Sequence, residues 1–294
     1  MGMVRTALDA VPARTMDEAE PADSSREFVF SDADFRSLVQ LAHDYAGISL
    51  GDNKRNLVYT RVSRRLRALG LKTFRDYRNH LGAHQDELES FINAISTNLT
   101  RFFRESHHFD HFRASVVIPY GARRGGRFRI WSAGCSTGEE PYTIAAVIRR
   151  EIENPSGRDL RVLATDIDTD VLGKAARGEY PLRGMDDVPG PYRDFFVRGG
   201  RDAGTILVSD DLRSLISFRH LNLISHWPFR GKFDAIFCRN VMIYFGAATR
   251  SDLIARFTAA LNPGGWLYIG HSESLLGSHP DLQLVGRTIY RRKG

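Results

Sequence analysis

A turn of small and acidic residues, SAGCSTGEEPY from Ser132 to Tyr142, precedes the helical pattern of Thr143 to Ile152. In an open α/β sheet, the turn after the first strand lies at the carboxyl ends of the strands, where ligands bind. Three kinds of chemistry suit such a turn. It could cradle a phosphate, present Ser136 as the nucleophile of a G-x-S-x-G elbow with Gly134 and Gly138, or form the floor of a nucleoside pocket.

The first two possibilities fit the local sequence less well. Cys135 and Ser136 stand where the dinucleotide fingerprint G-x-G-x-x-G needs its middle glycine, so the close approach of a pyrophosphate is less well provided for. For a serine hydrolase, His271 is available far downstream, but no H-G-G-G segment precedes the turn. Residues 139–141, Glu-Glu-Pro, also stand between the elbow and the expected helix. A ligand without a pyrophosphate is therefore favoured.

The end of the next predicted strand supports a nucleoside pocket. Asp166 lies in the run Leu163 to Asp168, and a carboxylate at this position can accept hydrogen bonds from both hydroxyls of a ribose. A hydrolase has no use for such an acceptor. The alternative is that Asp166 only caps the helix that begins near Thr169.

A small helical domain precedes the predicted sheet. Residues 1–25 hold few large apolar groups and are expected to be a disordered tail. Residues 26–96 show helical periodicity, beginning with a helix that Ser31 can cap. The second helix of this domain carries many arginines outside its apolar face, among them Arg61, Arg64 and Arg65. Residues 97–119 form a linker into the second domain.

Residues 120–294 alternate between strand and helix, which predicts a doubly wound, parallel α/β sheet of the Rossmann-like type. The expected helices cover residues 141–152, 169–177 and 248–261, and the expected strands cover residues 127–133, 160–165, 215–220, 233–238, 266–270 and 288–292. No clear helix joins the last two strands, so the final strand could run antiparallel. The pattern breaks at about residues 180–212, where the β-prone Thr205 to Val208 indicates a small β insertion.

Composition and charge indicate which kinds of partner, metal site and cell compartment to expect. The chain of 294 residues has a formal charge of +6, which favours an acidic partner. Cys135 and Cys238 have no partners at metal-ligand spacing, and we expect two buried thiols and no metal site. No apolar run is long enough to span a membrane and no signal peptide is evident, so we expect a cytoplasmic protein that does not insert into membranes.

Taken together, the turn, the acidic end of the second strand and the segment Phe237 to Tyr244 resemble the class I methyltransferases that use S-adenosylmethionine. More narrowly, the chain from about Ser31 to Tyr290 resembles the CheR family of chemotaxis receptor glutamate methyltransferases. Five ordered blocks carry this resemblance: residues 54–70, 97–105, 136–142, 164–168 and 237–244.

The resemblance implies a Rossmann-like methyltransferase sheet with an N-terminal all-helical domain, and a cofactor site shared between the linker and the sheet. The expected cofactor is S-adenosyl-L-methionine, which leaves as S-adenosyl-L-homocysteine. The residues implied to bind it are Asn98, Thr100, Arg104, Glu140, Asp166, Asn222, Leu223, Arg239 and Asn240. Two of them have simpler alternatives, because Leu223 could be plain core and Arg239 could only pair with a neighbouring acid.

The implied reaction is the attack of a glutamate carboxylate oxygen on the methyl carbon of the cofactor, which forms a methyl ester. A glutamate has an ordinary pKa of about 4.3, so it is ionised at neutral pH and needs no strong base. Arg104 is expected to bind a carboxylate, either that of the cofactor or that of the acceptor. Tyr244 could orient the acceptor oxygen, or it could be a core aromatic after a strand.

The family's substrates are acidic helical segments of methyl-accepting receptors, and the face with Arg61, Arg64 and Arg65 could dock one electrostatically. A solvated surface helix is the alternative. Nucleic-acid methylation is the main rival that the positive charge invites, but no Asn/Asp-Pro-Pro-Tyr motif follows the fourth strand, and aromatic residues are not interleaved with the basic helix as a stacking platform. No nucleic-acid partner is therefore expected. A protein that only senses the cofactor remains a further alternative.

Overall fold

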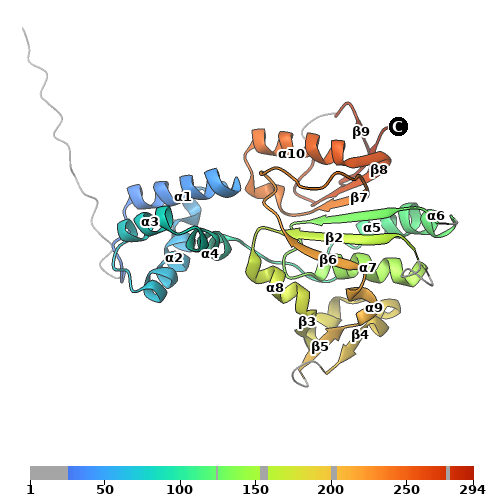
Figure 1. Ribbon diagram of the computed structural model, residues 1–294, viewed down its shortest axis with the longest axis horizontal. Helices are drawn as coiled ribbons and strands as arrows, with labels where there is room; N and C mark the ends of the chain where they lie inside the picture. Colours follow the sequence, from blue (N-terminus) through green and yellow to red (C-terminus); the bar gives the residue numbers. More distant parts are fainter. Residues whose placement is uncertain (1–25, 124, 153–157, 200–203, 276–278) are drawn as a thin grey trace, which may run out of the picture.

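The computed structural model describes residues 26–123, 125–152, 158–199, 204–275 and 279–294. The tail expected at residues 1–25 lies outside the described residues. A helical domain occupies one end of the molecule and a sheet with helices on its faces occupies the other (Figure 1). No helix in the described ranges combines the length and the apolar character needed to cross a bilayer.

Four helices form the N-terminal domain: α1 (Asp32–Ala46), α2 (Arg55–Leu69), α3 (Phe74–Ala83) and α4 (Gln85–Ile95). Ser31 and Asp34 make a capping box at the start of α1, because each side chain accepts a hydrogen bond from the backbone N–H of the other residue. Gly47 ends α1 with a φ of 72°, and a side chain at this position would press against Ile224 of the second domain. The four helices enclose their own apolar core.

The second half of the expected linker is helical. The chain is irregular from Ser96 to Ser106 and then forms α5 (His107–Phe112), a π-helical turn (Arg113–Val117) and α6 (Ile118–Gly121). Apolar residues of these turns, including Phe109, Phe112 and Val117, pack in the core under the sheet. This segment is thus part of the larger domain as well as a connection to it.

Seven strands form the main sheet in the order β6-β2-β1-β7-β8-β10-β9. Five of them are parallel: β1 (Phe128–Ala133), β2 (Leu160–Asp166), β6 (Ile216–His220), β7 (Phe233–Cys238) and β8 (Leu261–Ile269). The final strand β10 (Ile289–Arg292) runs antiparallel to β8, in agreement with the absence of a connecting helix. An additional edge strand, β9 (Leu282–Gly286), pairs with β10 and was not predicted.

Helices cover both faces of the sheet, as expected for a doubly wound fold. Neighbouring residues of β1 point to opposite faces, so Ile130 packs with α7 (Glu139–Glu151) while Trp131 packs with α10 (Ala247–Ala260). Helix α8 (Thr169–Arg177) contacts β2 and β6. Because α7 begins at Glu139, the prediction that the helix starts at Pro141 was two residues late.

The β insertion is a three-stranded antiparallel sheet in the order β3-β5-β4, formed by β3 (Glu179–Pro181), β4 (Phe196–Arg198) and β5 (Thr205–Val208). Two 3-10 turns (Leu182–Asp187 and Gly190–Phe195) lie between β3 and β4, and the short α9 (Asp210–Arg213) follows β5. The insertion projects from the α8 side of the larger domain (Figure 1). Phe102 of the linker packs edge-on against Tyr180 and Phe196, which fastens the insertion to the linker.

Candidate cofactor and acceptor site

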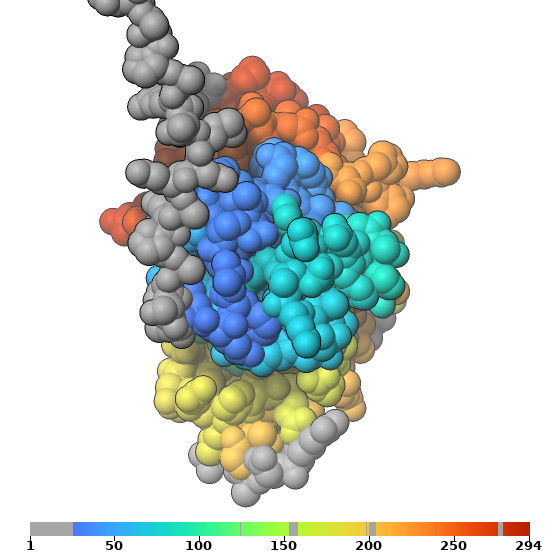
Figure 2. Space-filling model, turned by 90° about the vertical axis from the view of Figure 1, so that its left-hand side faces the viewer, coloured from blue at the N-terminus to red at the C-terminus, as the bar shows by residue number. Residues whose placement is uncertain are grey.

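A cavity of about 470 Å³ lies between the helical domain and the carboxyl ends of the parallel strands. The helical domain stands in front of this end of the sheet, with α10 above it and the β insertion below it in Figure 2. The volume falls in the range of about 300–1,000 Å³ that is usual for small-molecule sites. The cavity is lined by every residue that the sequence implied for cofactor binding or catalysis: Asn98, Thr100, Arg104, Glu140, Asp166, Asn222, Leu223, Arg239, Asn240 and Tyr244.

The turn after β1 forms one wall of the cavity. Gly134 has a φ of 82°, and a side chain there would clash with Val241 across the cavity edge. Ser136 also has a positive φ, of 49°, and its backbone N–H donates to Asp166 Oδ2 at 2.7 Å. The turn is therefore held in a tight conformation by a carboxylate from the neighbouring strand.

Ser136 lies just before the start of a helix, as in a serine hydrolase, but its surroundings are not those of a catalytic serine. Since α7 begins directly after Gly138, the expected separation of elbow and helix does not exist. The environment of Ser136 does not suit a nucleophile, because its Oγ donates to the carbonyl oxygen of Asn98 at 3.1 Å. Within the described ranges no histidine is hydrogen-bonded to this hydroxyl, so no base is in place to activate it.

Asp166 is an acceptor that is preorganised at the end of β2. Its side chain is nearly buried, and its Oδ1 accepts from the backbone N–H of Asp168 at 3.0 Å. Burial raises its pKa to about 6. The alternative that Asp166 caps the following helix is wrong, because Asp168 is the N-cap of α8 and accepts from Asp170 N and Val171 N. The lone pairs of Asp166 that the turn leaves free remain for hydroxyl donors.

The linker supplies polar groups from the opposite wall. Asn98 is held in place because its Nδ2 donates to Asp168 Oδ2 at 2.7 Å. Arg104 donates to the carbonyl oxygen of Leu99 at 2.9 Å and forms no ion pair within the part of the chain that the structure describes. Its remaining guanidinium N–H groups are therefore available for a carboxylate in the cavity.

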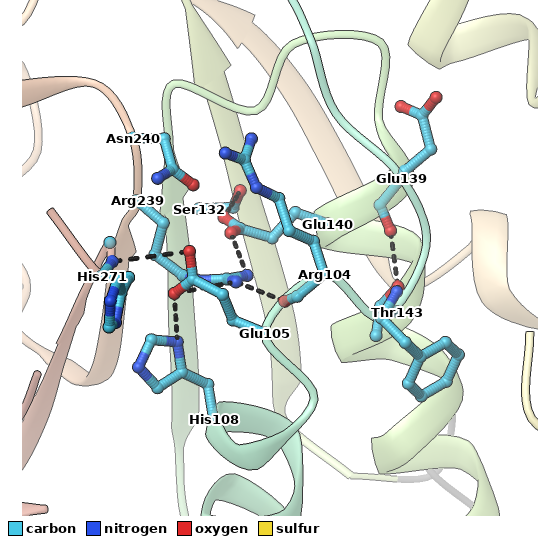
Figure 3. Close-up of polar contacts among 12 residues, drawn as sticks. Arg104, Glu105, His108, Ser132, Glu139, Glu140, Thr143, Arg239, Asn240 and His271 are labelled. Carbon is cyan, nitrogen blue, oxygen red and sulfur yellow. Dashed lines mark hydrogen bonds and ion pairs between the residues drawn. The ribbon is translucent and has the colours of Figure 1, made fainter. Parts of the chain in front are cut away.

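A buried network of charges closes the base of the cavity (Figure 3). Arg239 donates to Glu140 Oε2 at 3.0 Å, lies 3.5 Å from Glu105 Oε2, and also donates to the carbonyl oxygen of Arg104. Glu140 additionally accepts from Ser132 Oγ at 2.7 Å. Burial raises the pKa of Glu140, and the Arg239 guanidinium opposes this shift. These contacts match the simpler alternative for Arg239, which is an ion pair with a neighbouring acid.

Asn222, Leu223 and Tyr244 connect the cavity to the helical domain. Asn222 Nδ2 donates to the carbonyl oxygen of Tyr45 at 2.6 Å, and Ser49 N donates to the carbonyl oxygen of Tyr244 at 2.7 Å. Leu223 is buried, and it lines the cavity as well. Tyr244 is only half-buried and faces the cavity, so it is not a plain core aromatic.

Sequence reasoning missed several residues of the site. Ile48, Leu50 and Leu57 of the helical domain form part of the apolar wall. Glu105 belongs to the Arg239 network, and Glu273 accepts a hydrogen bond from the backbone of Asn240 in the loop after β7. Leu57 fits the helical pattern equally well as core, and Ile48 and Leu50 lie between α1 and α2, where no local pattern marks them as site residues. Glu105 ends the block of residues 97–105, but it and Glu273 act on residues far away in the chain.

The three arginines predicted for substrate binding lie outside the cavity lining. Arg61 donates to the carbonyl oxygens of Ala94 and Ser96 at 3.0 and 2.5 Å. Arg65 binds the buried Glu87 with two hydrogen bonds, at 2.9 and 2.5 Å. Arg64 is exposed and has no hydrogen-bond or ion-pair partner among the described residues.

Comparison with known proteins shows which family the chain belongs to. The family model "CheR methyltransferase, SAM binding domain" matches residues 98–291, and "CheR methyltransferase, all-alpha domain" matches residues 33–96. The chain is similar to the chemotaxis protein methyltransferase of Salmonella typhimurium, with 44% identity over 271 residues that cover 90% of this chain and 92% of the relative. The Escherichia coli protein of the same name is 42% identical over 271 residues, covering 90% and 93%. Chemotaxis protein methyltransferase 2 of Pseudomonas aeruginosa is 42% identical over 275 residues, covering 92% and 96%. The chain therefore belongs to the CheR methyltransferase family and carries its S-adenosylmethionine-binding domain.

Proposed function

We propose that this enzyme methylates glutamate side-chain carboxylates of chemotaxis receptors, using S-adenosylmethionine and forming glutamate methyl esters. The observation that carries the proposal is the cavity between the helical domain and the sheet, where the ten predicted residues meet. The names of the relatives, chemotaxis protein methyltransferases, support a receptor of the same signalling system as the methyl acceptor.

The residues of the cavity fit the groups of the cofactor. Asp166 provides carboxylate lone pairs for the ribose hydroxyls, and Glu140 provides negative charge for the ammonium group. Arg104 keeps unpaired guanidinium donors that suit the cofactor's carboxylate or that of the acceptor. When bound, S-adenosylmethionine supplies an electrophilic methyl group on a sulfonium.

The protein's own contribution is positioning. An ionised glutamate is already a nucleophile at neutral pH, so the site must orient the acceptor and exclude water. The hydroxyl of Tyr244 can donate to one acceptor oxygen, while Ile48 and Leu57 present an apolar wall that keeps water away. Positioning of this kind can contribute about 7–11 kcal/mol to lowering a barrier.

The basic face of α2 is the proposed docking surface for the receptor, with a narrower set of residues than the sequence suggested. Lys54, just before α2, lines the cavity and is exposed, and Arg64 is exposed about three turns further along the helix. Arg61 and Arg65 are bonded within the helical domain, so they stabilise the surface that carries Arg64. An acidic receptor helix complements this surface.

The test is transfer of radiolabelled methyl groups to a purified receptor cytoplasmic fragment. We expect label in the fragment that mild alkali releases as methanol, because methyl esters are base-labile. A fragment in which the acceptor glutamates are replaced by glutamine is the matched control and should remain unlabelled. Nucleic acid is offered in parallel. Label in nucleic acid, or alkali-stable label in the receptor, would contradict the proposal.

A further inference from the structure

Glu273 is a buried acid beyond the end of β8, with only 5% of its surface exposed. Its Oε2 accepts hydrogen bonds from the backbone N–H groups of Gly270 at 2.6 Å and Asn240 at 2.7 Å, and its Oε1 accepts from Ile243 N at 3.1 Å. It forms no salt bridge with any described residue. The hydrogen bonds of this carboxylate thus come from backbone amides, and those of Asn240 and Ile243 lie in the loop that follows β7.

That loop carries several of the residues that line the cavity. Arg239, Asn240 and Tyr244 all line it, and Tyr244 also joins the helical domain through the hydrogen bond from Ser49. Asn240 has a φ of 60°, so the loop begins in the left-handed conformation, which is uncommon for residues other than glycine although asparagine adopts it more readily than most. Glu273 is the side chain that holds the amides on both sides of this bend.

The contacts around Gly270 show how tightly Glu273 and the loop are packed. A Cβ atom at Gly270 would lie 2.6 Å from Asn240 Nδ2 and 2.6 Å from Glu273 Oε2. Gly270 therefore allows the carboxylate and the loop to approach each other closely.

We propose that Glu273 is a positioning residue for methyl transfer, which fixes the loop from Arg239 to Tyr244 at the acceptor end of the cavity. This inference rests on the proposed function for its kinetic readout. A carboxylate suits the role because two anionic oxygens can accept all three N–H groups. A glutamine has one acceptor oxygen and two N–H donors, so one backbone amide must face a donor.

The test compares Glu273→Gln with the wild-type enzyme. The glutamine oxygen can keep the two shorter hydrogen bonds, to Gly270 and Asn240, and the lost bond is then the one to Ile243, next to Tyr244. We expect kcat for methylation of the receptor fragment to fall at least about tenfold. The Kd for S-adenosylhomocysteine should change less than about threefold, since the cofactor side of the loop remains held.

Two further variants separate positioning from stability. Asp234→Asn alters a carboxylate at the opposite end of β7, which accepts from Arg129 N at 2.8 Å and from Asn262 Nδ2 at 2.9 Å. We expect it to lower Tm without lowering kcat. Glu273→Asp keeps both anionic oxygens and should retain more activity than Glu273→Gln. It also serves as the test variant if the glutamine protein does not fold.

Hydrogen exchange provides a readout that does not depend on the acceptor. The amide of Ile243 should exchange at least about tenfold faster in Glu273→Gln, while amides of the helical domain are unchanged. A wild-type enzyme that fails to methylate the receptor would refute the proposed function and leave this loop measurement valid. Unchanged exchange at Ile243, an unchanged kcat, or a loss of kcat in Asp234→Asn of the same size would overturn the role of Glu273.

Discussion

Replacing Asp166 by asparagine removes one anionic oxygen from the centre of the cofactor site. Both carboxylate oxygens already accept backbone N–H groups, from Ser136 at 2.7 Å and from Asp168 at 3.0 Å. The asparagine amide must therefore turn its NH₂ group toward one of these donors. A buried donor without its acceptor costs about 1–3 kcal/mol of stability, so Asp166→Asn should fold but melt at a lower temperature.

The same change should weaken cofactor binding by a calculable amount. A hydrogen bond to a charged group contributes about 1.5–3 kcal/mol, and one hydroxyl of the ribose loses such an acceptor. At 1.4 kcal/mol per tenfold change, the Kd for S-adenosylhomocysteine should rise by about 10- to 140-fold. The loss affects binding directly, because Asp166 lines the cavity.

Isothermal titration calorimetry with S-adenosylhomocysteine measures this change, and circular dichroism confirms that the variant is folded. Asp159→Asn is the matched control, since Asp159 lies just before the other end of β2 and pairs with Arg129 outside the cavity. It should bind with the wild-type Kd. If folded Asp166→Asn binds within about twofold of wild type, Asp166 does not hold the ribose and the assignment of the cavity is refuted.

Two other predictions concern pH and docking. Because burial raises the pKa of Asp166 to about 6, the affinity for S-adenosylhomocysteine should fall as the pH drops from 7 to 5, and calorimetry of Asp166→Asn should show a weaker dependence. The effect on stability has the opposite sign. The pKa of Asp166 in the folded protein lies above the ordinary value of 3.8. Its contribution to the free energy of unfolding is therefore fully present below pH 3.8 and is lost as the pH rises through about 6. Arg64→Glu should lower kcat/KM for the receptor roughly tenfold at low salt, with an unchanged Kd for S-adenosylhomocysteine. Arg75→Glu, at an exposed arginine of α3, is its control, and equal losses in both variants would argue against a specific docking surface.

An element can be predicted with its bounds when capping residues mark both of its ends. Helix α8 has the predicted bounds, Thr169–Arg177, because Asp168 caps its first amides and Gly178 ends it with a φ of 63°. Strand β9 lacks such a signal. Its residues Leu284 and Val285 are neighbours on opposite faces, and both are exposed, at 61% and 50%, so the strand shows no alternation of apolar and polar residues.

The cavity was predictable where the polar residues follow a strand or a recognisable family block. Asp166 at the end of β2 is such a case. The contribution of the helical domain was not predictable, because Ile48 and Leu57 are apolar residues that also pack against the core of that domain. The docking of the two domains turns this side of the helical domain toward the cofactor site, through contacts that include the hydrogen bonds from Asn222 to the backbone of Tyr45 and from Ser49 to the backbone of Tyr244.

Strained backbone and buried carboxylates occur together at this site. Ser136 and Asn240, with φ values of 49° and 60°, both line the cavity, and the N–H of each donates to a buried acid at 2.7 Å. A positive φ costs a residue other than glycine of the order of 1–3 kcal/mol, less for asparagine, and a charge-assisted hydrogen bond of about 1.5–3 kcal/mol is large enough to offset it. Asp166 and Glu273 therefore have the same role in two neighbouring loops, because each accepts the N–H of a residue with a positive φ. Each acid holds a turn that would otherwise relax away from the cavity, so neutralising either one should loosen the turn it binds and leave the other turn in place.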